Sequence, residues 1–457
     1  MKLIRNGILV YPKESLKADL LIDGEKICRI APSIDAPEGC ELIDAAGKLV
    51  FPGFIDAHTH FDLHVAGTVT VDDFASGTMA EAAGGTTSII DFATAYPGES
   101  LNEGLDNWFR KAEAGCSCDY GFHQTLTDWN GEICAEVRDM IERGVTTFKI
   151  YMTYDTRVDD CTILKVLKRL KELGATTGCH CENSGMIDAL REEFAADDRI
   201  RKVSSHYLTR PAAAEAEAIG RYCHLAEVAG EPVIDVHLTC AEGLEEIRAA
   251  RKRGQKVYAE TCPQYLVMDD SFYEKPHFES AKYVCAPPLR KKDDQEVLWK
   301  AIADGEIQTV STDHCSFTME QKELGYEDFR KIPGGMPGAE TRAAVIYSEG
   351  VAKGRITKEK MCEVLAENPA RLYGLYPRKG VLAEGSDADL VILDPAGKKT
   401  VTVSEQVSRC DYAPLEGMEL TGTIDAVYLR GEKVAENGRV ILENRGQYLK
   451  RNLPEYF

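Results

Sequence analysis

The sequence has no long hydrophobic run and no paired cysteine motif. None of its apolar stretches reaches the roughly 18 residues that a membrane-spanning helix needs, and its first residues lack the pattern of a signal peptide. The 15 cysteines are scattered, without a Cys-x-x-Cys spacing. In a long chain without a secretion signal, this pattern indicates free thiols in a reducing compartment. We therefore expect a cytoplasmic protein that is not attached to a membrane.

The chain has fewer basic than acidic residues. The chain has 54 lysines and arginines against 75 acidic residues, which gives a formal net charge of −21. Such a surface repels phosphate backbones, so we expect no general binding of nucleic acid. Low-complexity tracts and short internal repeats are also absent. Apolar residues make up 44% and charged residues 28% of the chain, and this ordinary composition predicts a globular core.

The two ends of the chain have the pattern of short β-strands joined by tight turns. In residues 1–50, an apolar run ends at the hairpin signal Asp23-Gly24, and in residues 380–445 a similar run ends at Asp394-Pro395. Because both ends share this character and the middle does not, we expect them to meet in one small β domain. Residues 51–379 are then inserted between its two halves.

The middle of the chain alternates buried strands with amphipathic helices. Helical patterns cover 163–173 and 242–253. The strands are predicted at 88–92, 119–123, 146–152, 176–180, 233–238, 256–260 and 308–313. Repeated βα units of this size predict a parallel sheet, most simply an α/β fold of the (β/α)8 TIM-like barrel type. A doubly wound open sheet is the alternative, but no Gly-x-Gly-x-x-Gly motif supports it.

Residues that can bind a metal recur where these strands end. His58 and His60 follow one apolar run, and His180, His237 and Asp313 each end another. Side chains two apart on a strand share a face, and the carboxyl ends of barrel strands form one rim. Imidazole suits zinc and similar divalent metals. One His-x-His pair is also typical of a polar loop, and Asp313 can cap a helix, but the recurrence favours a metal site.

Lys149 is unusual because it lies inside an apolar strand. A protonated lysine has no lone pair for a metal, and burying its charge unpaired costs several kcal/mol. It can instead extend its ammonium group from the strand end to solvent. If carbon dioxide carbamylates it, the resulting anion can bridge two cations about 3.5–4 Å apart. Cys315 follows Asp313 closely, but without a partner residue we interpret it as a packed or pocket-lining thiol.

Several motifs together resemble the hydantoinase/dihydropyrimidinase family of the amidohydrolase superfamily. The segment FPGFIDAHTH (51–60) is similar to the superfamily's opening motif. The family itself is matched by GTVTVDDF (67–74), SGT (76–78), GGTTSIID (84–91), ETCPQYL (260–266), APPLR (286–290) and GSDADLV (385–391). The segment DYAPLEG (411–417) looks most like the phenylhydantoinase-type members. The resemblance spans almost the whole chain.

The resemblance implies a binuclear metal centre on a barrel, with zinc as the expected metal and a β-sandwich built from both chain ends. The implied ligands are His58, His60, carbamylated Lys149, His180, His237 and Asp313. The two histidines of the first motif and Asp313 bind the more buried metal, Lys149 bridges both metals, and the other two histidines bind the more exposed one. Asp313 also carries the proton to the leaving nitrogen. Tyr154 matches the tyrosine that hydrogen-bonds the ring carbonyl and the developing oxyanion.

The implied reaction is hydrolysis of hydantoin or dihydropyrimidine rings to N-carbamoyl amino acids. Ala286 and Gly334 stand where many relatives have serine and asparagine, at positions that contact the ring imide mainly through backbone groups. The residues expected to shape the rest of the pocket are Leu63, His64, Val65, Thr94, Arg157 and Cys315. Arg157 favours an anionic substituent unless it is a solvated surface residue. Two alternatives are an allantoinase-like hydrolase and a non-catalytic assembly protein with the same fold.

The resemblance further implies a homotetramer, with a dimer as the alternative. The segment 446–457 contains three aromatic residues but is too short for a core of its own. It therefore either frays, docks on its own chain or packs against a neighbouring subunit.

Overall fold

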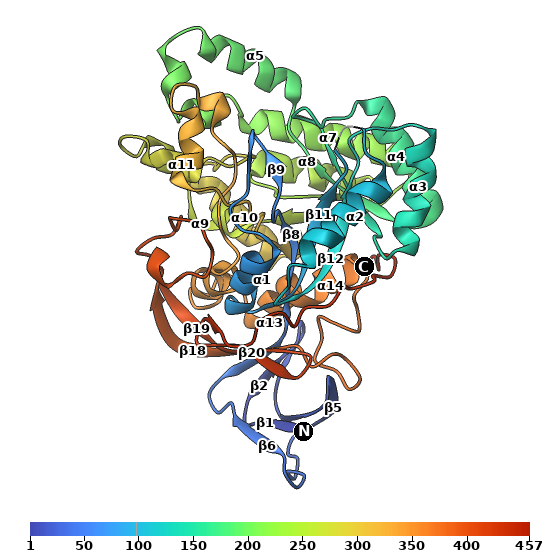
Figure 1. The fold of residues 1–457 in the computed structure, drawn as a ribbon, viewed down its shortest axis with the longest axis vertical. Helices are drawn as coiled ribbons and strands as arrows, with labels where there is room; N and C mark the ends of the chain where they lie inside the picture. The colour runs from blue at the N-terminus through green and yellow to red at the C-terminus, as the bar shows by residue number, and fades with distance from the viewer. Residues whose placement is uncertain (97) are drawn as a thin grey trace.

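The computed structural model of the protein describes residues 1–96 and 98–457, and its centre is a parallel eight-stranded barrel (Figure 1). In chain order the barrel strands are β8 (Phe54–Thr59), β11 (Thr86–Thr94), β12 (Asp119–Thr125), β13 (Thr147–Tyr151), β14 (Thr176–His180), β15 (Val233–Asp235), β16 (Val257–Thr261) and β17 (Thr309–Val310). The barrel closes where the backbone NH of His60 donates to the carbonyl of His314 at 2.8 Å. The predicted TIM-like barrel is confirmed.

Helices follow the strands and cover the outside of the barrel (Figure 1). The α-helices are α1 (Phe74–Ala83), α2 (Leu101–Ala112), α3 (Gly131–Glu142), α4 (Asp160–Leu173), α5 (Ser184–Ala195), α6 (Ser205–Leu208), α7 (Ala212–Ala229), α8 (Ala241–Lys252), α9 (Pro263–Val267), α10 (Lys292–Ala303), α11 (Met319–Lys322), α12 (Arg342–Val345), α13 (Lys358–Cys362) and α14 (Asn368–Leu372). Helix α4 illustrates why they form. Asp159 caps its first turn, Gly174 ends it in the left-handed conformation, and Ile163, Val166 and Leu170 bury one stripe.

Shorter helical turns lie in the connections and after α12 and α13. The 3-10 turns are η1 (Asp198–Arg201), η2 (Asp270–Glu274), η3 (Glu279–Tyr283), η4 (Glu323–Gly325), η5 (Phe329–Lys331) and η8 (Val403–Glu405), and the π-helical turns are η6 (Ile346–Val351) and η7 (Glu363–Glu367). A two-stranded hairpin, β9 (His64–Val65) with β10 (Thr68–Val69), stands beyond the end of β8.

Both chain ends build two further sheets below the barrel (Figure 1). One has the order β5-β4-β1-β6 and the other the order β21-β20-β19-β18-β7-β2-β3. Their strands are β1 (Lys2–Arg5), β2 (Ile8–Val10), β3 (Ser15–Lys17), β4 (Asp19–Asp23), β5 (Lys26–Ala31), β6 (Glu41–Asp44), β7 (Leu49–Pro52), β18 (Leu390–Thr400), β19 (Glu419–Leu429), β20 (Glu432–Glu436) and β21 (Arg439–Val440). Leu20, Val50 and Leu390 share one buried cluster there. Strand β7 joins the two ends, because it pairs with β2 on one side and β18 on the other.

The expectation of a separate β domain made from both ends is therefore confirmed. Its exact division from the barrel, at residues 50 and 380, stays a prediction.

Arg342 links the first and last barrel strands, β8 and β17, through hydrogen bonds. Its buried guanidinium donates to the carbonyl of Ile55 in β8 at 2.8 Å and to that of Val310 in β17 at 2.9 Å. A third donor reaches Thr86 Oγ1 at 2.9 Å. These acceptors compensate the cost of burying the cation, so the short strand β17 is held in place by a side chain as well as by its ladder.

The C-terminal tail lies across the amino ends of the barrel strands of its own chain. Tyr120 and the tail exchange two backbone hydrogen bonds, from Tyr120 NH to Gln447 O at 3.0 Å and from Leu449 NH to Tyr120 O at 2.7 Å. Leu449 is fully buried, and the buried Arg451 donates to Thr147 Oγ1 at 2.9 Å. The tail is thus self-docked. A contact with a neighbouring subunit stays a prediction.

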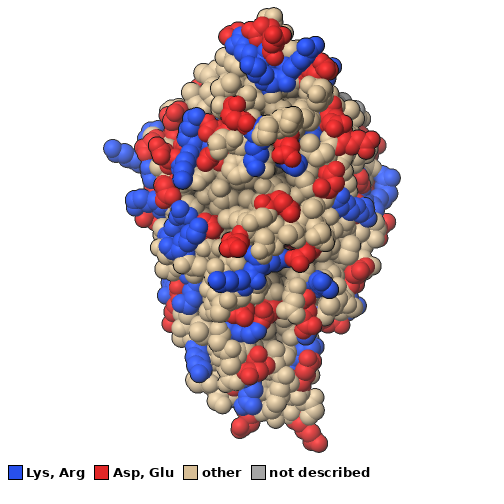
Figure 2. Space-filling view, turned by 90° about the vertical axis from the view of Figure 1, so that its left-hand side faces the viewer, with Lys and Arg blue, Asp and Glu red and all other residues tan. Residues whose placement is uncertain are grey.

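Figure 2 shows lysine and arginine side chains interspersed with acidic ones over the face drawn there. No helix in the described ranges is long and apolar enough to cross a membrane.

Candidate active site

Three predicted ligands meet at the carboxyl rim of the barrel. Nε2 of His58 lies 3.3 Å, and Nε2 of His60 3.2 Å, from Oδ1 of Asp313. Potential ligand atoms of all three residues lie within 4.8 Å of one another. His58 lies near the end of β8 and His60 directly follows that strand, while Asp313 follows β17, the neighbouring strand across the seam where the barrel closes. Two imidazoles and a carboxylate form a donor set that suits a divalent metal.

A carboxylate behind His58 orients its ring. His58 Nδ1 lies 2.6 Å from Oε1 of the buried Glu260, and Oε2 of Glu260 accepts a hydrogen bond from Ser311 Oγ at 2.7 Å. A proton held between Nδ1 and the carboxylate leaves Nε2 free to face a cation. Burial, and after it the charge of Lys149, lowers the pKa of His58 and favours the neutral ring that binds metals.

Lys149 is buried close to this group, because the ring of Phe92 contacts both its side chain and the two histidines. Its Nζ has no hydrogen-bond partner among the described residues, and it lies 5.1 Å from the ring centre of Phe92 and 5.3 Å from that of Tyr151. Burial lowers the pKa of Lys149, which favours the neutral amine. A neutral amine is the form that reacts with carbon dioxide. An orphaned buried amine beside imidazoles and a carboxylate therefore fits a lysine that binds metal after carbamylation.

The other two predicted histidines complete the ring of ligand candidates. The ring centres of His180 and His237 are 4.6 Å apart, and those of His237 and His58 are 5.4 Å apart. Nδ1 of His237 is buried without a hydrogen-bond partner in the described part of the chain. The structure thus gathers all six predicted ligands at one end of the barrel.

Three predicted site residues have a left-handed backbone that non-glycine residues rarely adopt. The φ angles are 70° for Tyr154, 44° for His237 and 52° for Asp313. Such conformations cost on the order of 1–3 kcal/mol each and concentrate at functional sites. They also explain why β15 and β17 end earlier than predicted, at Asp235 and Val310, because the left-handed residues leave the sheet and turn into the rim.

A buried ion pair lies behind His180 and was missed by the sequence analysis. His180 Nε2 lies 2.7 Å from Oε2 of Glu182, and the same oxygen accepts a hydrogen bond from Arg210. Burial raises the pKa of Glu182, but Arg210 and His180 outweigh it and hold the pKa at about 2. The guanidinium carbon of Arg210 lies 5.3 Å from the ring centre of Tyr154. The available signals were the His-x-Glu spacing for Glu182 and the strand-end position of Glu260, but nothing in the sequence marked Arg210.

The predicted oxyanion donor stands over this rim. The Tyr154 side chain is 37% exposed, and its ring centre lies 5.0 Å from that of His180. The exposed Arg157 donates from its backbone NH and its guanidinium to the carbonyl of Tyr154, each at 3.2 Å. Arg157 therefore holds the turn of Tyr154, which is a local role besides any contact with a substituent.

The remaining pocket candidates lie in the loops above the rim. His64 and Val65 form the exposed strand β9, directly after the half-buried Leu63. Thr94 ends β11 and is half-buried, with its hydroxyl 3.4 Å from that of Thr125. The buried Cys315 donates from Sγ to the carbonyl of the exposed Gly334 at 3.8 Å, and Ala286 is half-buried in the loop after η3.

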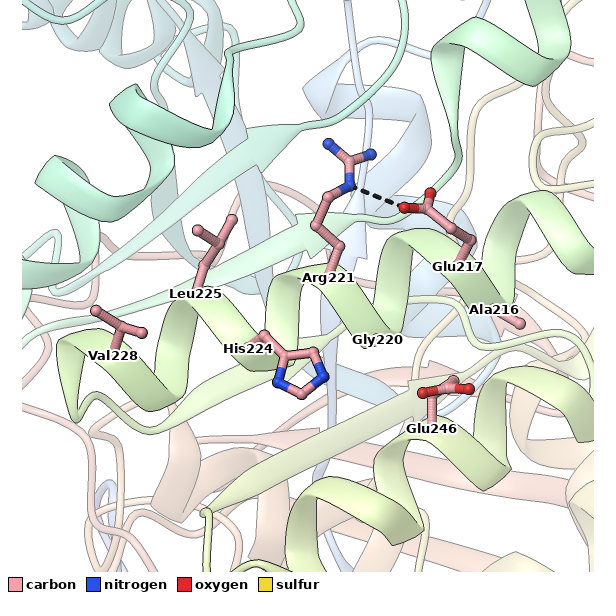
Figure 3. Close-up of a pocket in the computed structure, with 8 residues that line it drawn as sticks. All are labelled: Ala216, Glu217, Gly220, Arg221, His224, Leu225, Val228 and Glu246. Atoms are coloured by element: carbon pink, nitrogen blue, oxygen red, sulfur yellow. Dashed lines mark hydrogen bonds and ion pairs between the residues drawn. The ribbon is translucent and has the colours of Figure 1, made fainter.

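A surface hollow elsewhere contains none of the predicted site residues. Figure 3 shows it between α7 and α8, lined by Ala216, Glu217, Gly220, Arg221, His224, Leu225, Val228 and Glu246. Arg221 and Glu217 pair there at 3.2 Å, on the outer face of the barrel's helical layer. Its lining has no cluster of metal-binding groups comparable to the rim, so we place the chemistry at the rim.

Comparison with known proteins supports this reading. The family model described as "Amidohydrolase family" matches residues 49–434. A D-hydantoinase of Geobacillus stearothermophilus is 46% identical over 98% of this chain and 96% of its own, and a D-phenylhydantoinase of Escherichia coli O81 (strain ED1a) is 40% identical over 98% of both chains. The crystal structure of a dihydropyrimidinase from Brevibacillus agri NCHU1002 superposes with a TM-score of 0.97 at 42% identity over the whole of both chains.

An L-hydantoinase (dihydropyrimidinase) from Arthrobacter aurescens has a TM-score of 0.90 at 30% identity, over 98% of this chain and 99% of that one. The resemblance inferred from the motifs is confirmed. The matched family model, the full-length relatives and the shared barrel lead to one conclusion, that this chain belongs to the amidohydrolase family.

Proposed function

We propose that the protein opens the cyclic amide bond of hydantoins or dihydropyrimidines and releases N-carbamoyl amino acids, at a centre of two divalent metal ions. The observation that carries the proposal is the gathering of five other ligand candidates near Lys149, whose buried Nζ lacks a partner in the described residues. Relatives named hydantoinase and dihydropyrimidinase over the full chain length support the same substrate class. They favour it over an allantoin-like substrate or a purely structural role.

In this proposal, each ligand candidate has its own place. His58, His60 and Asp313 would hold one metal, His180 and His237 would hold the other, and Lys149, once carbamylated, would be a ligand of both. Zinc suits this mixture of imidazole and carboxylate-like donors. Metals bound there supply Lewis acidity, which activates water and polarises an amide carbonyl.

The protein's own groups then manage protons and charge. Burial raises the pKa of Asp313, but His58 and His60 outweigh it, so the pKa lies below its ordinary value and the group is an ionised carboxylate. We propose that Asp313 takes the proton of the attacking water and passes it to the leaving ring nitrogen. Tyr154 donates a hydrogen bond to the oxygen that becomes negative as the tetrahedral centre forms.

Substrate recognition is assigned to the loops above the rim. Backbone groups near Ala286 and Gly334 receive the ring imide, while Leu63, His64, Val65, Thr94, Arg157 and Cys315 surround the ring substituent. The left-handed turn at Tyr154 supports this assignment, because it aims the phenol over His180.

We further propose a homotetramer in a reducing cytoplasm. All fifteen cysteines are free, which is the state expected of such a compartment. The tail 446–457 and the exposed faces of the barrel helices are the candidate surfaces for assembly.

The test is a substrate panel on metal-reconstituted protein. It comprises 5-substituted hydantoins of both configurations, dihydrouracil, allantoin and dihydroorotate, with ring opening followed by chromatography. We expect turnover of hydantoins or dihydrouracil and little of the last two. Preferred turnover of allantoin or dihydroorotate, or no turnover of any ring, contradicts the proposal.

A further inference from the structure

A second buried lysine lies outside the metal-binding group. Lys322, the last residue of α11, is fully buried, and its ammonium group donates to the carbonyls of Val284 at 3.0 Å, Pro333 at 2.7 Å and Gly335 at 2.8 Å. Within the described ranges it forms no ion pair with a carboxylate. An ammonium group has three N–H donors, so the three carbonyls match it in number. These backbone acceptors offset part of the cost of burying Lys322.

The three carbonyls belong to two segments that are both expected to contact the ring imide. Val284 lies two residues before Ala286, and Pro333 and Gly335 flank Gly334. The two segments also meet directly, since the NH of Gly335 donates to the carbonyl of Val284 at 2.9 Å. Lys322 therefore lies at the junction of the two loops assigned to the ring imide.

The residue before Lys322 reaches a third wall of the pocket. Nε2 of Gln321 donates to Thr68 Oγ1 at 2.8 Å and to the carbonyl of Val69 at 2.7 Å, both in the hairpin that follows His64. One turn of helix thus ties the hairpin on one side and both imide loops on the other. This convergence distinguishes α11 from an ordinary packed helix.

We propose that Lys322 is a positioning residue that sets the separation of the backbone groups at Ala286 and Gly334, and with it the affinity for the cyclic imide. The inference rests on the proposed function, because that function assigns the ring to these loops. Lys322 touches none of the ligand candidates. Its loss should therefore weaken ring binding while the metal centre and the chemical step are retained.

Lys322→Met tests this, because methionine fills a similar volume without donors. We expect KM for the best cyclic substrate to rise about tenfold, which is the order of one lost hydrogen-bonding contribution, with kcat changed less than about threefold and metal content unchanged. Lys171→Met is the matched control. It removes a lysine that donates to one backbone carbonyl, that of Ala229 at 3.1 Å, on the outer helices, and it should leave both constants as in the wild type.

Three outcomes overturn the inference. One is a folded, metal-loaded Lys322→Met protein whose KM stays within about twofold of the wild type, even if its melting temperature falls. Another is equal loss of metal and kcat. The third is a wild type that opens no cyclic amide, and it overturns the proposed function as well. The first two leave the proposed function intact.

Hydrogen–deuterium exchange of the wild type without ligand is the second measurement, needed if the variant does not fold. Positioning by Lys322 requires slow exchange in peptides covering 284–290 and 333–338 before any substrate binds. Rapid exchange in both peptides overturns the inference without a variant.

Discussion

At the scale of single residues, Lys149 is the most informative side chain, because its buried Nζ has no hydrogen-bond partner in the described chain. Its strand neighbours Phe148 and Ile150 are apolar and buried, so an unpaired ammonium group at Lys149 would be costly, and the proposed carbamate would remove that cost. The surrounding imidazoles are close enough to share such a ligand, as the 4.6 Å separation of the His180 and His237 rings indicates.

Lys149→Ala should lose most of the bound metal and nearly all activity, because the bridge between the two sites is removed. Short carboxylic acids such as acetate should restore part of the activity by occupying the space of the carbamate. Metal analysis and turnover with and without added acid check this. Two metals per chain and full activity in the variant would contradict a bridging role.

Tyr154→Phe removes one expected oxyanion donor and keeps the ring over His180. At comparable sites such a loss costs on the order of 10²–10³ in kcat, and we expect that range here with an unchanged fold. Steady-state kinetics beside a circular dichroism spectrum make the comparison. A loss below about threefold on the best substrate means that Tyr154 serves only packing.

At the scale of elements, several barrel strands bring ligand candidates to the rim: His58 lies in β8, Lys149 in β13 and His180 at the end of β14. His180 is the clearest case, since β14 ends on it. Its partner Glu182 follows two residues later, and Arg210 reaches Glu182 from the connection between α6 and α7. The anionic Glu182, with its pKa held at about 2, is the acceptor that fixes the ring.

Glu182→Gln should therefore weaken metal binding or activity by roughly 10–100-fold, the range seen when a carboxylate behind a metal-binding histidine is replaced. Glu217→Gln is the control, because it changes a carboxylate that pairs with Arg221 on the outer surface. Competition with a metal chelator measures the affinity. Equal affinities for the Glu182 variant and the control would show that the pair behind His180 is only structural.

The comparison of prediction with structure is also clearest for the elements. Strand β14 begins and ends as predicted, and α4 and α8 lie within three residues of their predicted limits. Strands β15 and β17 are shorter than predicted because His237 and Asp313 take up left-handed backbones, which no local pattern reveals.

The residues of the candidate active site could also be predicted only in part. Strand-end position and motif resemblance were enough to select the residues that the structure gathers at the rim. Glu182, Glu260, Arg210 and Lys322 were not identified. The His-x-Glu spacing was available for Glu182, but Arg210 lies 28 residues from Glu182 and Glu260 lies 202 residues from His58, so these pairs form only when the chain folds.

At the scale of the whole molecule, both ends of the chain pack against other parts of the same fold. Its two ends share a sheet through β7, and its tail crosses the amino ends of the barrel strands. Buried Leu449 and Arg451 make that tail part of the folded unit.

Truncation after Gly446 should lower stability, because it exposes the surface under Leu449. Losing that one side chain to alanine would by itself cost about 2–5 kcal/mol. Chemical denaturation measures the loss, and light scattering of the same samples reports assembly. An unchanged denaturation midpoint would contradict the docking, whereas an unchanged oligomer would refute only a role of the tail between subunits.

The most direct test of the central claim is a metal titration of the metal-free protein, with bound metal per chain and hydantoin ring opening measured in the same samples and with carbon dioxide present. The account predicts activity that rises with occupancy and is complete at two metals per chain, and that is much lower when bicarbonate and carbon dioxide are excluded during reconstitution. Full ring-opening activity in the metal-free protein, or none with two metals bound, would contradict it.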